Sequence, residues 1–195
     1  MTKDEVLAEF RNSKALLEGH FLLTSGLHSP LYLQCARVLM EPKRAERLCR
    51  ALAEKVVSAL GKGAIDCVVS PALGGIVVGY ELARQLGVPS MFTERVDGTV
   101  ALRRGFEITR GARVLMAEDV VTTGLSSREC IACIQEHGGK VVAACCLADR
   151  SDGAAEVGVP LISLLAMKVA SYPADQLPPE LARLPAVKPG SRAQV

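Results

Sequence analysis

Hydrophobic and polar positions along the chain follow two patterns, one typical of amphipathic helices and one typical of buried strands. Helical spacing of apolar residues predicts helices at residues 3–18, 42–60, 75–86 and 127–137. Short apolar runs bounded by turn residues predict buried strands at residues 66–70, 90–94, 114–117, 140–147 and 161–165. Because helices and strands alternate, we expect an α/β fold: a doubly wound, five-stranded, mainly parallel sheet with flanking helices.

Three further segments lie outside this alternation. Residues 19–33 have apolar positions on both sides of a glycine, which predicts two short strands joined by a turn. Residues 95–106 contain an Asp-Gly pair between alternating residues, which predicts a β-hairpin. Residues 172–195 contain five prolines, so we expect coil there, with one helical turn near Glu180.

Length and charge indicate an ordinary single domain. A chain of 195 residues can form one substantial core, and we divide this domain (1–195) into an N-terminal hood (1–40), a core (41–170) and a C-terminal tail (171–195). The net charge of +2 gives no indication of a nucleic-acid surface. No apolar run approaches the roughly 18 residues that span a membrane, and the N-terminus does not read as a secretory signal.

The cysteines indicate the compartment. The chain has seven, an odd number, which is typical of reduced thiols in the cytoplasm. Cys130 and Cys133 form a C-x-x-C, but they fall on a predicted helix, and Cys145 and Cys146 fall within a predicted strand. We therefore expect small buried hydrophobic side chains there rather than metal ligands.

The main candidate site lies at residues 113–126, which read R-V-L-M-A-E-D-V-V-T-T-G-L-S. Glu118 and Asp119 follow a predicted strand, and the small residues at 122–126 open the next helix. Ligands bind at the carboxyl ends of parallel strands, and amides at a helix start can cradle a phosphate. Paired acids beside such a cradle suit sugar hydroxyls or a divalent cation. Simple helix capping is the alternative, but the order of the parts favours a sugar phosphate.

Other segments carry groups that suit anions. Residues 70–75, S-P-A-L-G-G, again lie between a predicted strand and a helix, where an ordinary turn is the alternative. The predicted hairpin carries Arg95, Arg103 and Arg104, whose guanidinium groups suit phosphate oxygens unless they form only a solvated basic surface. Arg150 follows the fourth predicted strand, where it can reach the same crevice or form a surface salt bridge.

The stretch E-D-V-V-T-T-G-L-S at residues 118–126 resembles the 5-phosphoribosyl 1-diphosphate (PRPP) motif of type I phosphoribosyltransferases, in the form found in orotate phosphoribosyltransferases. Residues 19–32 resemble the N-terminal segment of that family, and residues 70–76 resemble its pyrophosphate loop. The resemblance covers nearly the whole chain. It implies transfer of ribose 5-phosphate from PRPP to orotate, giving orotidine 5′-monophosphate and pyrophosphate in pyrimidine (UMP) biosynthesis.

The resemblance also implies residue roles. The catalytic residues would be Glu118, Asp119, Arg103 and Arg104. The orotate-binding residues would be Thr122, Arg150 and Thr24, with Arg150 pairing with the orotate carboxylate. The PRPP-binding residues would be Glu118, Asp119, Val120, Val121, Thr122, Thr123, Gly124, Leu125, Ser126, Arg95, Ala72, Leu73 and Gly74. The expected cofactor is Mg²⁺, carried on PRPP, with no metal ligand directly from the protein.

The chain departs from the family pattern at three places. Thr24 stands where some members have a lysine that contacts orotate, and Leu73-Gly74 supplies no lysine to the pyrophosphate loop. The hairpin has arginines where many members have lysines and a histidine. By the resemblance, the protein is a cytoplasmic homodimer in which the hairpin closes over the neighbouring active site.

Two alternatives remain open at this point. The first is a sister phosphoribosyltransferase that acts on another nucleobase, because Thr24 replaces the lysine. The second is a non-catalytic regulator that senses PRPP and controls a nucleic acid or protein partner. The near-neutral charge gives no support to a nucleic-acid partner.

Overall fold

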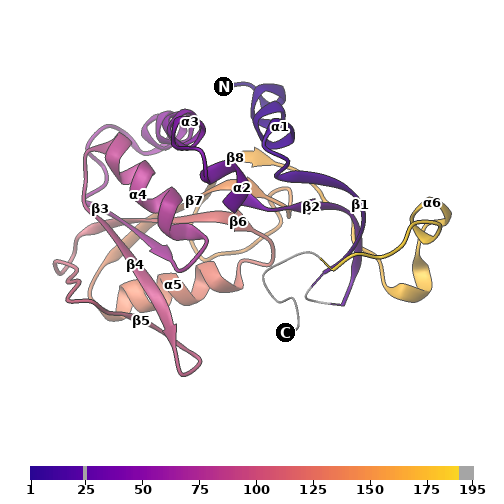
Figure 1. The fold of residues 1–195 in the computed structure, drawn as a ribbon. Coiled ribbons are helices and arrows are strands. Elements are labelled where there is room, and N and C mark those ends of the chain that lie inside the picture. Colours follow the sequence, from indigo (N-terminus) through magenta and orange to yellow (C-terminus); the bar gives the residue numbers. More distant parts are fainter. Residues whose placement is uncertain (24–25, 189–195) are drawn as a thin grey trace.

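The computed structural model describes residues 1–23 and 26–188, in which helices pack on both faces of a central sheet (Figure 1). The helices are α1 (Lys3–Asn12), α2 (Cys35–Leu39), α3 (Pro42–Leu60), α4 (Gly75–Leu86), α5 (Leu125–Glu136), α6 (Pro179–Ala182) and a 3₁₀ turn (Ala174–Gln176). The strands are β1 (Leu16–Leu22), β2 (His28–Leu33), β3 (Cys67–Pro71), β4 (Ser90–Val96), β5 (Thr99–Leu102), β6 (Arg113–Val121), β7 (Lys140–Asp149) and β8 (Leu161–Ala166).

The central sheet has the strand order β5-β4-β3-β6-β7-β8. Strands β4, β3, β6, β7 and β8 run parallel, and β5 pairs antiparallel with β4. The five predicted parallel strands are confirmed, and the hairpin adds a sixth strand that the prediction did not count. Helices α3 and α4 cover one face and α5 covers the other, so the predicted doubly wound fold is confirmed (Figure 1).

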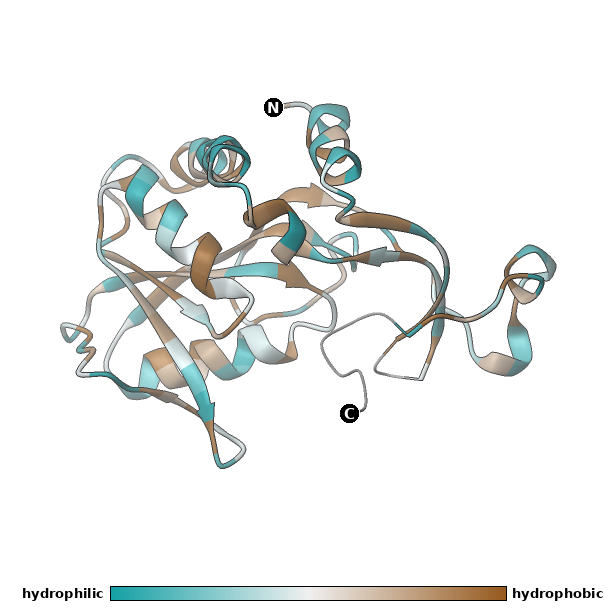
Figure 2. Ribbon diagram, viewed as in Figure 1, coloured by the Kyte–Doolittle hydropathy of each residue, from teal (hydrophilic) through white to brown (hydrophobic). Residues whose placement is uncertain are grey.

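Side chains of β6 pack against helices on both faces of the sheet. Leu115 and Ala117 pack in the core cluster that includes α3 and α4, whereas Val114 and Met116 pack in the cluster that includes α5. Successive side chains of a strand point to opposite faces, so a strand covered on both faces is hydrophobic throughout. The covering helices instead alternate hydrophobic and hydrophilic segments, as Figure 2 shows for α3 and α5.

The N-terminal helix is shorter than predicted. A capping box between Thr2 and Glu5 begins α1, but the helix ends at Asn12, and the backbone reverses at Lys14, whose φ is +53°. From Leu16 the chain continues as β1, which pairs with β2. The prediction of a helix to residue 18 was therefore wrong at its end, because strand pairing with a later segment overrode the helical spacing. Helix α2 was not predicted.

The C-terminal tail is bound to the predicted two-stranded hood. His28 and Tyr172 exchange two backbone hydrogen bonds of 2.8 Å, and the amide of Val187 donates to the carbonyl of His20 at 2.8 Å. The imidazole of His20 contacts the carbonyl of Leu184 at 2.8 Å and the His28 ring at 2.6 Å. The helical turn predicted near residue 180 is present as α6. The tail is therefore part of the hood.

The cysteines agree with the prediction of buried, reduced thiols. All seven are free and buried, and Cys130 packs against the hydroxyl of Thr93 at 3.5 Å. Burial raises the pKa of the Cys130 thiol to about 12, so this side chain stays neutral. Within residues 1–23 and 26–188, none of the helices has the length and apolar character that crossing a membrane requires.

Candidate active site

The candidate site lies where the strand order reverses. From β3 the chain crosses through α4 to β4 on one side, and from β6 it crosses through α5 to β7 on the other. The carboxyl ends of β3 and β6 are therefore neighbours, and both lead into helix starts. In open parallel sheets this point forms a crevice that binds ligands. The two segments singled out by sequence, 70–75 and 118–126, lie on its two sides.

The turn from β6 to α5 has the features of a phosphate cradle. Thr122 and Thr123 are exposed, and no hydrogen bond among the described residues uses the amides of Thr122, Thr123 or Gly124. The first amides of α5 also lack partners within the helix. The guanidinium of Arg128 holds the turn against the β7–β8 connection, because it donates hydrogen bonds to the carbonyls of Thr123, at 2.9 Å, and Glu156, at 2.7 Å. Unpaired donors on a fixed turn can bind an anion.

Gly124 is required by the shape of this turn. Its φ of +73° lies in the left-handed region, which residues with a side chain rarely adopt. A Cβ atom at this position would also lie 2.8 Å from Cγ1 of Val157 and 3.2 Å from Nη1 of Arg128. The turn can therefore approach the β7–β8 connection closely only because residue 124 is a glycine.

The carboxylate of Glu118 points toward the start of α5. Only 6% of the residue is exposed, and its two oxygens accept hydrogen bonds from the hydroxyls of Ser126 and Ser127. Burial raises the pKa of Glu118 while the two hydroxyls lower it, because they stabilise the charged form. The Ser126 hydroxyl, which sequence assigned to phosphate, thus donates to Glu118. Sequence analysis missed Ser127 altogether.

Asp119 lies on the opposite face of β6. Its carboxylate lies so close to Gly74 that a Cβ atom there would be 2.7 Å from Oδ2 of Asp119. Burial raises the pKa of the Asp119 carboxyl, and the amides of Val120 and of Asp119 itself lower it. The two acids that are adjacent in sequence therefore have different surroundings. Glu118 is bound to α5, whereas Asp119 faces the turn between β3 and α4.

The remaining valines of the motif serve packing. Val120 packs against the cluster that includes α3 and α4, and Val121 is buried in the cluster that includes α5. Leu125 is instead 57% exposed. Val121 therefore offers only its backbone for ligand contacts, whereas Val120 is partly exposed.

The β3–α4 turn is neutral and open. Ala72 is joined to the sheet by its amide, which donates to the carbonyl of Thr93 at 2.7 Å, and the Ala72–Leu73 peptide bond is cis. Leu73 is 85% exposed, and Gly74 is the N-cap of α4. Among the described residues, no hydrogen bond uses the amides of Leu73 or Gly74. The predicted neutral pyrophosphate loop therefore presents free amides beside Asp119.

The three hairpin arginines are exposed but differ in how they are held. Arg95 donates to Glu129 on α5 and to the carbonyl of Gly98. Arg104 donates to Glu94 at 3.0 Å and lies 5.5 Å from the centre of the Phe92 ring. Arg103 only approaches the same Glu94, at 4.0 Å. Because β4 is parallel to β3, the hairpin that follows β4 extends from the side of the sheet where the carboxyl ends of the strands and the crevice lie (Figure 1).

Arg150 follows β7 at the same edge. Its amide donates to the carbonyl of Val121 at 2.9 Å, which ties it to the end of β6. Its side-chain Nε is buried and has no hydrogen-bond partner among the described residues. Burial lowers the pKa of the guanidinium, and nearby Tyr32 and Cys35 raise it. A buried, incompletely paired cation suits an anionic ligand. Thr24, the third predicted orotate contact, lies outside the described residues.

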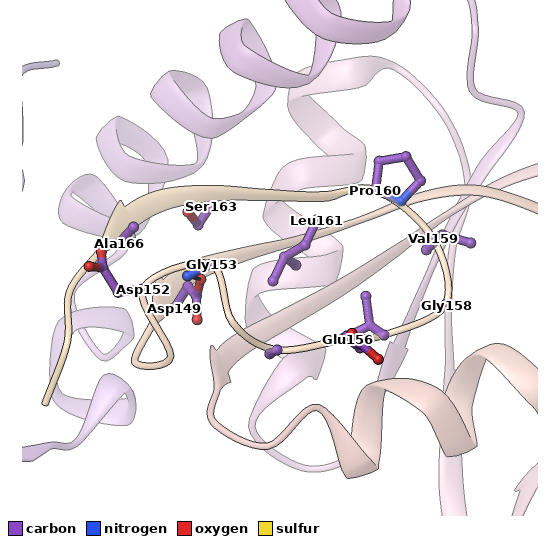
Figure 3. Close-up of a pocket in the computed structure, with 12 residues that line it drawn as sticks. Asp149, Asp152, Gly153, Glu156, Gly158, Val159, Pro160, Leu161, Ser163 and Ala166 are labelled. Atoms are coloured by element: carbon purple, nitrogen blue, oxygen red, sulfur yellow. Dashed lines mark hydrogen bonds between the residues drawn. The ribbon is translucent and has the colours of Figure 1, made fainter. Parts of the chain in front are cut away.

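A pocket of about 690 Å³ lies beside the β7–β8 connection (Figure 3). Asp149 lines it, and its carboxylate accepts hydrogen bonds from the amides of Ser151, at 2.8 Å, and Gly153, at 2.7 Å. In the alternative interpretation, Arg150 would form a surface salt bridge with this carboxylate. The Asp149 carboxylate already accepts these two backbone hydrogen bonds. Arg150 forms no ion pair with Asp149 or Asp152 in the part of the chain that the structure describes.

A family model described as the phosphoribosyl transferase domain matches residues 39–169. The chain belongs to the phosphoribosyl transferase family. This phosphoribosyl transferase is 62% identical to the orotate phosphoribosyltransferase of Maricaulis maris over 192 residues, which are 98% of each chain. It is 59% identical to the orotate phosphoribosyltransferase of Novosphingobium aromaticivorans, with both chains fully covered. The family that the motif at 118–126 resembles is thus confirmed.

Solved structures agree with this assignment. The orotate phosphoribosyltransferase of Aeropyrum pernix matches with a TM-score of 0.70 and 27% identity, over 84% of this chain and 94% of the other. The enzyme of Mycobacterium tuberculosis in complex with PRPP matches with a TM-score of 0.64 and 25% identity, over 84% and 96%. Within the phosphoribosyl transferase family, the chain therefore groups with the orotate phosphoribosyltransferases.

Proposed function

We propose that the protein transfers the ribose 5-phosphate group of PRPP to orotate, which gives orotidine 5′-monophosphate and pyrophosphate for UMP synthesis. The observation that carries this proposal is the pairing of two helix starts at one switch point, with the Asp119 carboxylate between them and a half-buried arginine, Arg150, after the neighbouring strand. Relatives that are 56–62% identical bear the name of this activity.

Each part of PRPP has a suitable group in the crevice. The 5′-phosphate suits the free amides and hydroxyls of Thr122 and Thr123. The diphosphate suits the neutral amides of Leu73 and Gly74, with Arg95 and Arg103 on the hairpin to neutralise its charge. The ribose would lie between these two turns, next to Asp119 and above Glu118.

The chemistry requires positioning and charge stabilisation rather than a protein nucleophile. Positive charge builds on the ribose carbon as the bond to diphosphate breaks, and the carboxylates of Asp119 and Glu118 favour that charge. Phosphate contacts far from this carbon hold it in place for attack by the orotate ring nitrogen. Arg150 would orient the orotate carboxylate, and Thr122 would contact the ring. Closure of the hairpin would exclude water from the intermediate.

We propose that Mg²⁺ enters the crevice with PRPP. Mg²⁺ prefers oxygen ligands and keeps several from substrate phosphates and water. No group of three or more His, Cys, Asp or Glu in residues 1–23 and 26–188 could hold a metal ion by itself. Bound Mg²⁺ would neutralise the diphosphate leaving group. The carboxylate of Asp119 lies beside that loop.

We also propose a cytoplasmic homodimer with one hairpin over the neighbouring site. Seven buried free thiols support a reducing compartment. Three exposed apolar side chains lie at helical spacing along α4 and its preceding turn, Leu73 (85%), Val77 (47%) and Tyr80 (66%).

Sedimentation velocity tests the dimer. Mixing the inactive variants Arg103→Ala and Asp119→Asn tests whether two subunits share each site. Random exchange of subunits makes about half of the dimers mixed, and each mixed dimer has one intact site, so about a quarter of the wild-type activity should return. A monomer, or a mixture without recovery, would reject this arrangement.

The test of the activity follows orotate absorbance with PRPP and Mg²⁺, beside parallel reactions with adenine, hypoxanthine and uracil. We expect orotate to be consumed only when PRPP and Mg²⁺ are both present. Turnover of another base alone would assign the protein to a sister transferase. Binding of PRPP without turnover of any base would favour the regulator. Arg150→Ala should lose orotate selectivity, whereas Arg110→Ala, which removes an exposed arginine that precedes β6, is the control and should not.

A further inference from the structure

The buried carboxylate of Glu118 is held by two serines that differ in exposure. Ser126 is exposed, and its hydroxyl donates to Oε1 of Glu118. Ser127 is fully buried, and its hydroxyl donates to Oε2. Both serines lie in the first turn of α5, which begins at Leu125. The carboxylate therefore connects strand β6 to the helix start that carries the proposed phosphate cradle.

Among the described residues, no cationic side chain pairs with the Glu118 carboxylate. The carboxylate accepts side-chain hydrogen bonds only from the two serines. The titratable groups that face it are Asp119 on β6 and the buried thiols of Cys130 on α5 and Cys146 on β7. A buried carboxylate is costly unless its oxygens are paired, so the two hydroxyls stabilise the charged form of Glu118 in this position.

Exposure separates the roles of the serines. Water or a ligand can replace the hydroxyl of Ser126, because that residue lies at the surface of the turn. Nothing can replace the hydroxyl of Ser127, because the residue has no solvent access. We infer that Ser127 is a positioning residue that fixes Glu118 and, through it, the phosphate-binding turn, and that Ser126 is the exchangeable donor that passes from Glu118 to the incoming 5′-phosphate. This inference rests on the proposed function and extends it.

The first test needs no ligand. The carboxyl groups of glutamate are labelled with ¹³C, Glu118 is assigned with Glu118→Gln, and its titration is followed by NMR. Ser127→Ala should raise the apparent pKa of Glu118 by about one unit, because a hydrogen bond to the charged form is lost. Ser126→Ala should raise it less, since water takes the place of the hydroxyl. Ser13→Ala is the control, because its hydroxyl caps the end of α1.

The second test measures binding of PRPP with Mg²⁺ by calorimetry. Ser127→Ala should weaken binding about tenfold at neutral pH, and the acidic limb of the binding profile should move to higher pH. In a Glu118→Gln background, the same serine substitution should cost less than threefold, because the titrating carboxylate through which Ser127 acts is gone. Glu118→Gln keeps one oxygen that accepts from one serine and adds an amide group that can donate to the hydroxyl of the other. Both serines therefore keep a partner, so this background is expected to retain the fold if Ser127→Ala alone does not.

An unchanged titration of Glu118 in Ser127→Ala would overturn the inference. So would an equal loss of binding with and without Glu118→Gln, because it would show a merely structural serine. A wild-type protein that binds PRPP but does not consume orotate rejects the proposed function alone. A wild-type protein that binds no PRPP rejects both.

Discussion

The two strand-to-helix turns of the crevice follow neighbouring parallel strands but differ in their chemistry. At β6–α5, a buried carboxylate braces the helix start and two threonines are exposed beside it. At β3–α4, the turn has no polar side chain, and its main feature is the lack of a side chain at Gly74, which leaves room for Asp119. Side-chain hydrogen bonds hold the β6–α5 turn, whereas the β3–α4 turn presents unpaired backbone amides and leaves room for the Asp119 carboxylate.

This difference separates the roles of Glu118 and Asp119. A strand alternates its faces, so neighbouring residues of β6 are directed to different helices. Glu118 contributes to the structure of the β6–α5 turn, whereas Asp119 has no hydrogen-bonded side-chain partner among the described residues and lies beside the open turn. Adjacent acids in a motif need not act as a pair of equal ligands.

The largest effect should come from Asp119→Asn. The change keeps the shape of the side chain but removes the negative charge beside the proposed position of the ribose carbon, and kcat should fall about 10²- to 10³-fold. The melting temperature should stay unchanged, because the carboxylate makes no ion pair among the described residues. Glu118→Gln should lose less activity and more stability. Equal kinetic losses in the two variants would contradict the separation of roles.

Gly74→Ala should have the next largest effect. Its Cβ would lie 2.7 Å from Oδ2 of Asp119, so the carboxylate must move and activity should fall about 10- to 100-fold. Steady-state kinetics of the single and double variants with Asp119→Ala provide the check, because the alanine at residue 74 should cost nothing further once the carboxylate is gone. Additive losses would show that the glycine matters for another reason.

Gly124→Ala should instead act mainly on stability. The residue has a φ of +73° and a Cβ would lie 2.8 Å from Val157, so the free energy of unfolding should fall by about 1–3 kcal/mol. Urea denaturation measures the change. Gly98→Ala is the matched control, because its φ of +85° is similar but nothing lies within 4 Å of the added atom. If both variants lose the same stability, contact with Val157 is unimportant.

The smallest effect should come from the other end of β6. Asp66 accepts hydrogen bonds from the backbone and side chain of Arg113, and these lower its pKa from 3.8 to about 2. Because the folded-state pKa is lowered, the pair stabilises the fold above pH 3.8, and the contribution is lost as the pH falls through about 2. Asp66→Asn should therefore lower the melting temperature slightly at pH 7, with no loss of activity. A difference that persists below pH 2 would contradict this origin.

Most of the fold and the position of the site could be predicted from sequence. The parallel strands follow from apolar runs, and the crevice follows from the motifs at their carboxyl ends. The end of α1 could not be predicted, because it depends on pairing of Leu16 with Leu33 seventeen positions later. The sixth strand was missed because its four residues were read only as an arm of the hairpin.

The details of the site depended on contacts between distant residues. The strand expected at 114–117 extends to Val121 in the structure, so face alternation separates the two acids that sequence treated together. The approach of Asp119 to Gly74, and the ion pairs of the hairpin arginines with Glu94 and Glu129, join residues that no local pattern connects. Ser127 carried one available signal, a second hydroxyl in the first turn of the helix after a buried acid.

The attachment of the tail to the hood has a consequence for synthesis of the chain. β1 and β2 are made before the strands of the core, but Tyr172 and Val187, which pair with the hood, are made after them. A ribosome translates from the N-terminus, so the hood cannot be completed until the tail has left the exit tunnel. The parallel core can form before that moment, and the cover over it is finished afterwards. The nascent protein would therefore complete the two strand-to-helix turns of the crevice before it completes the hood.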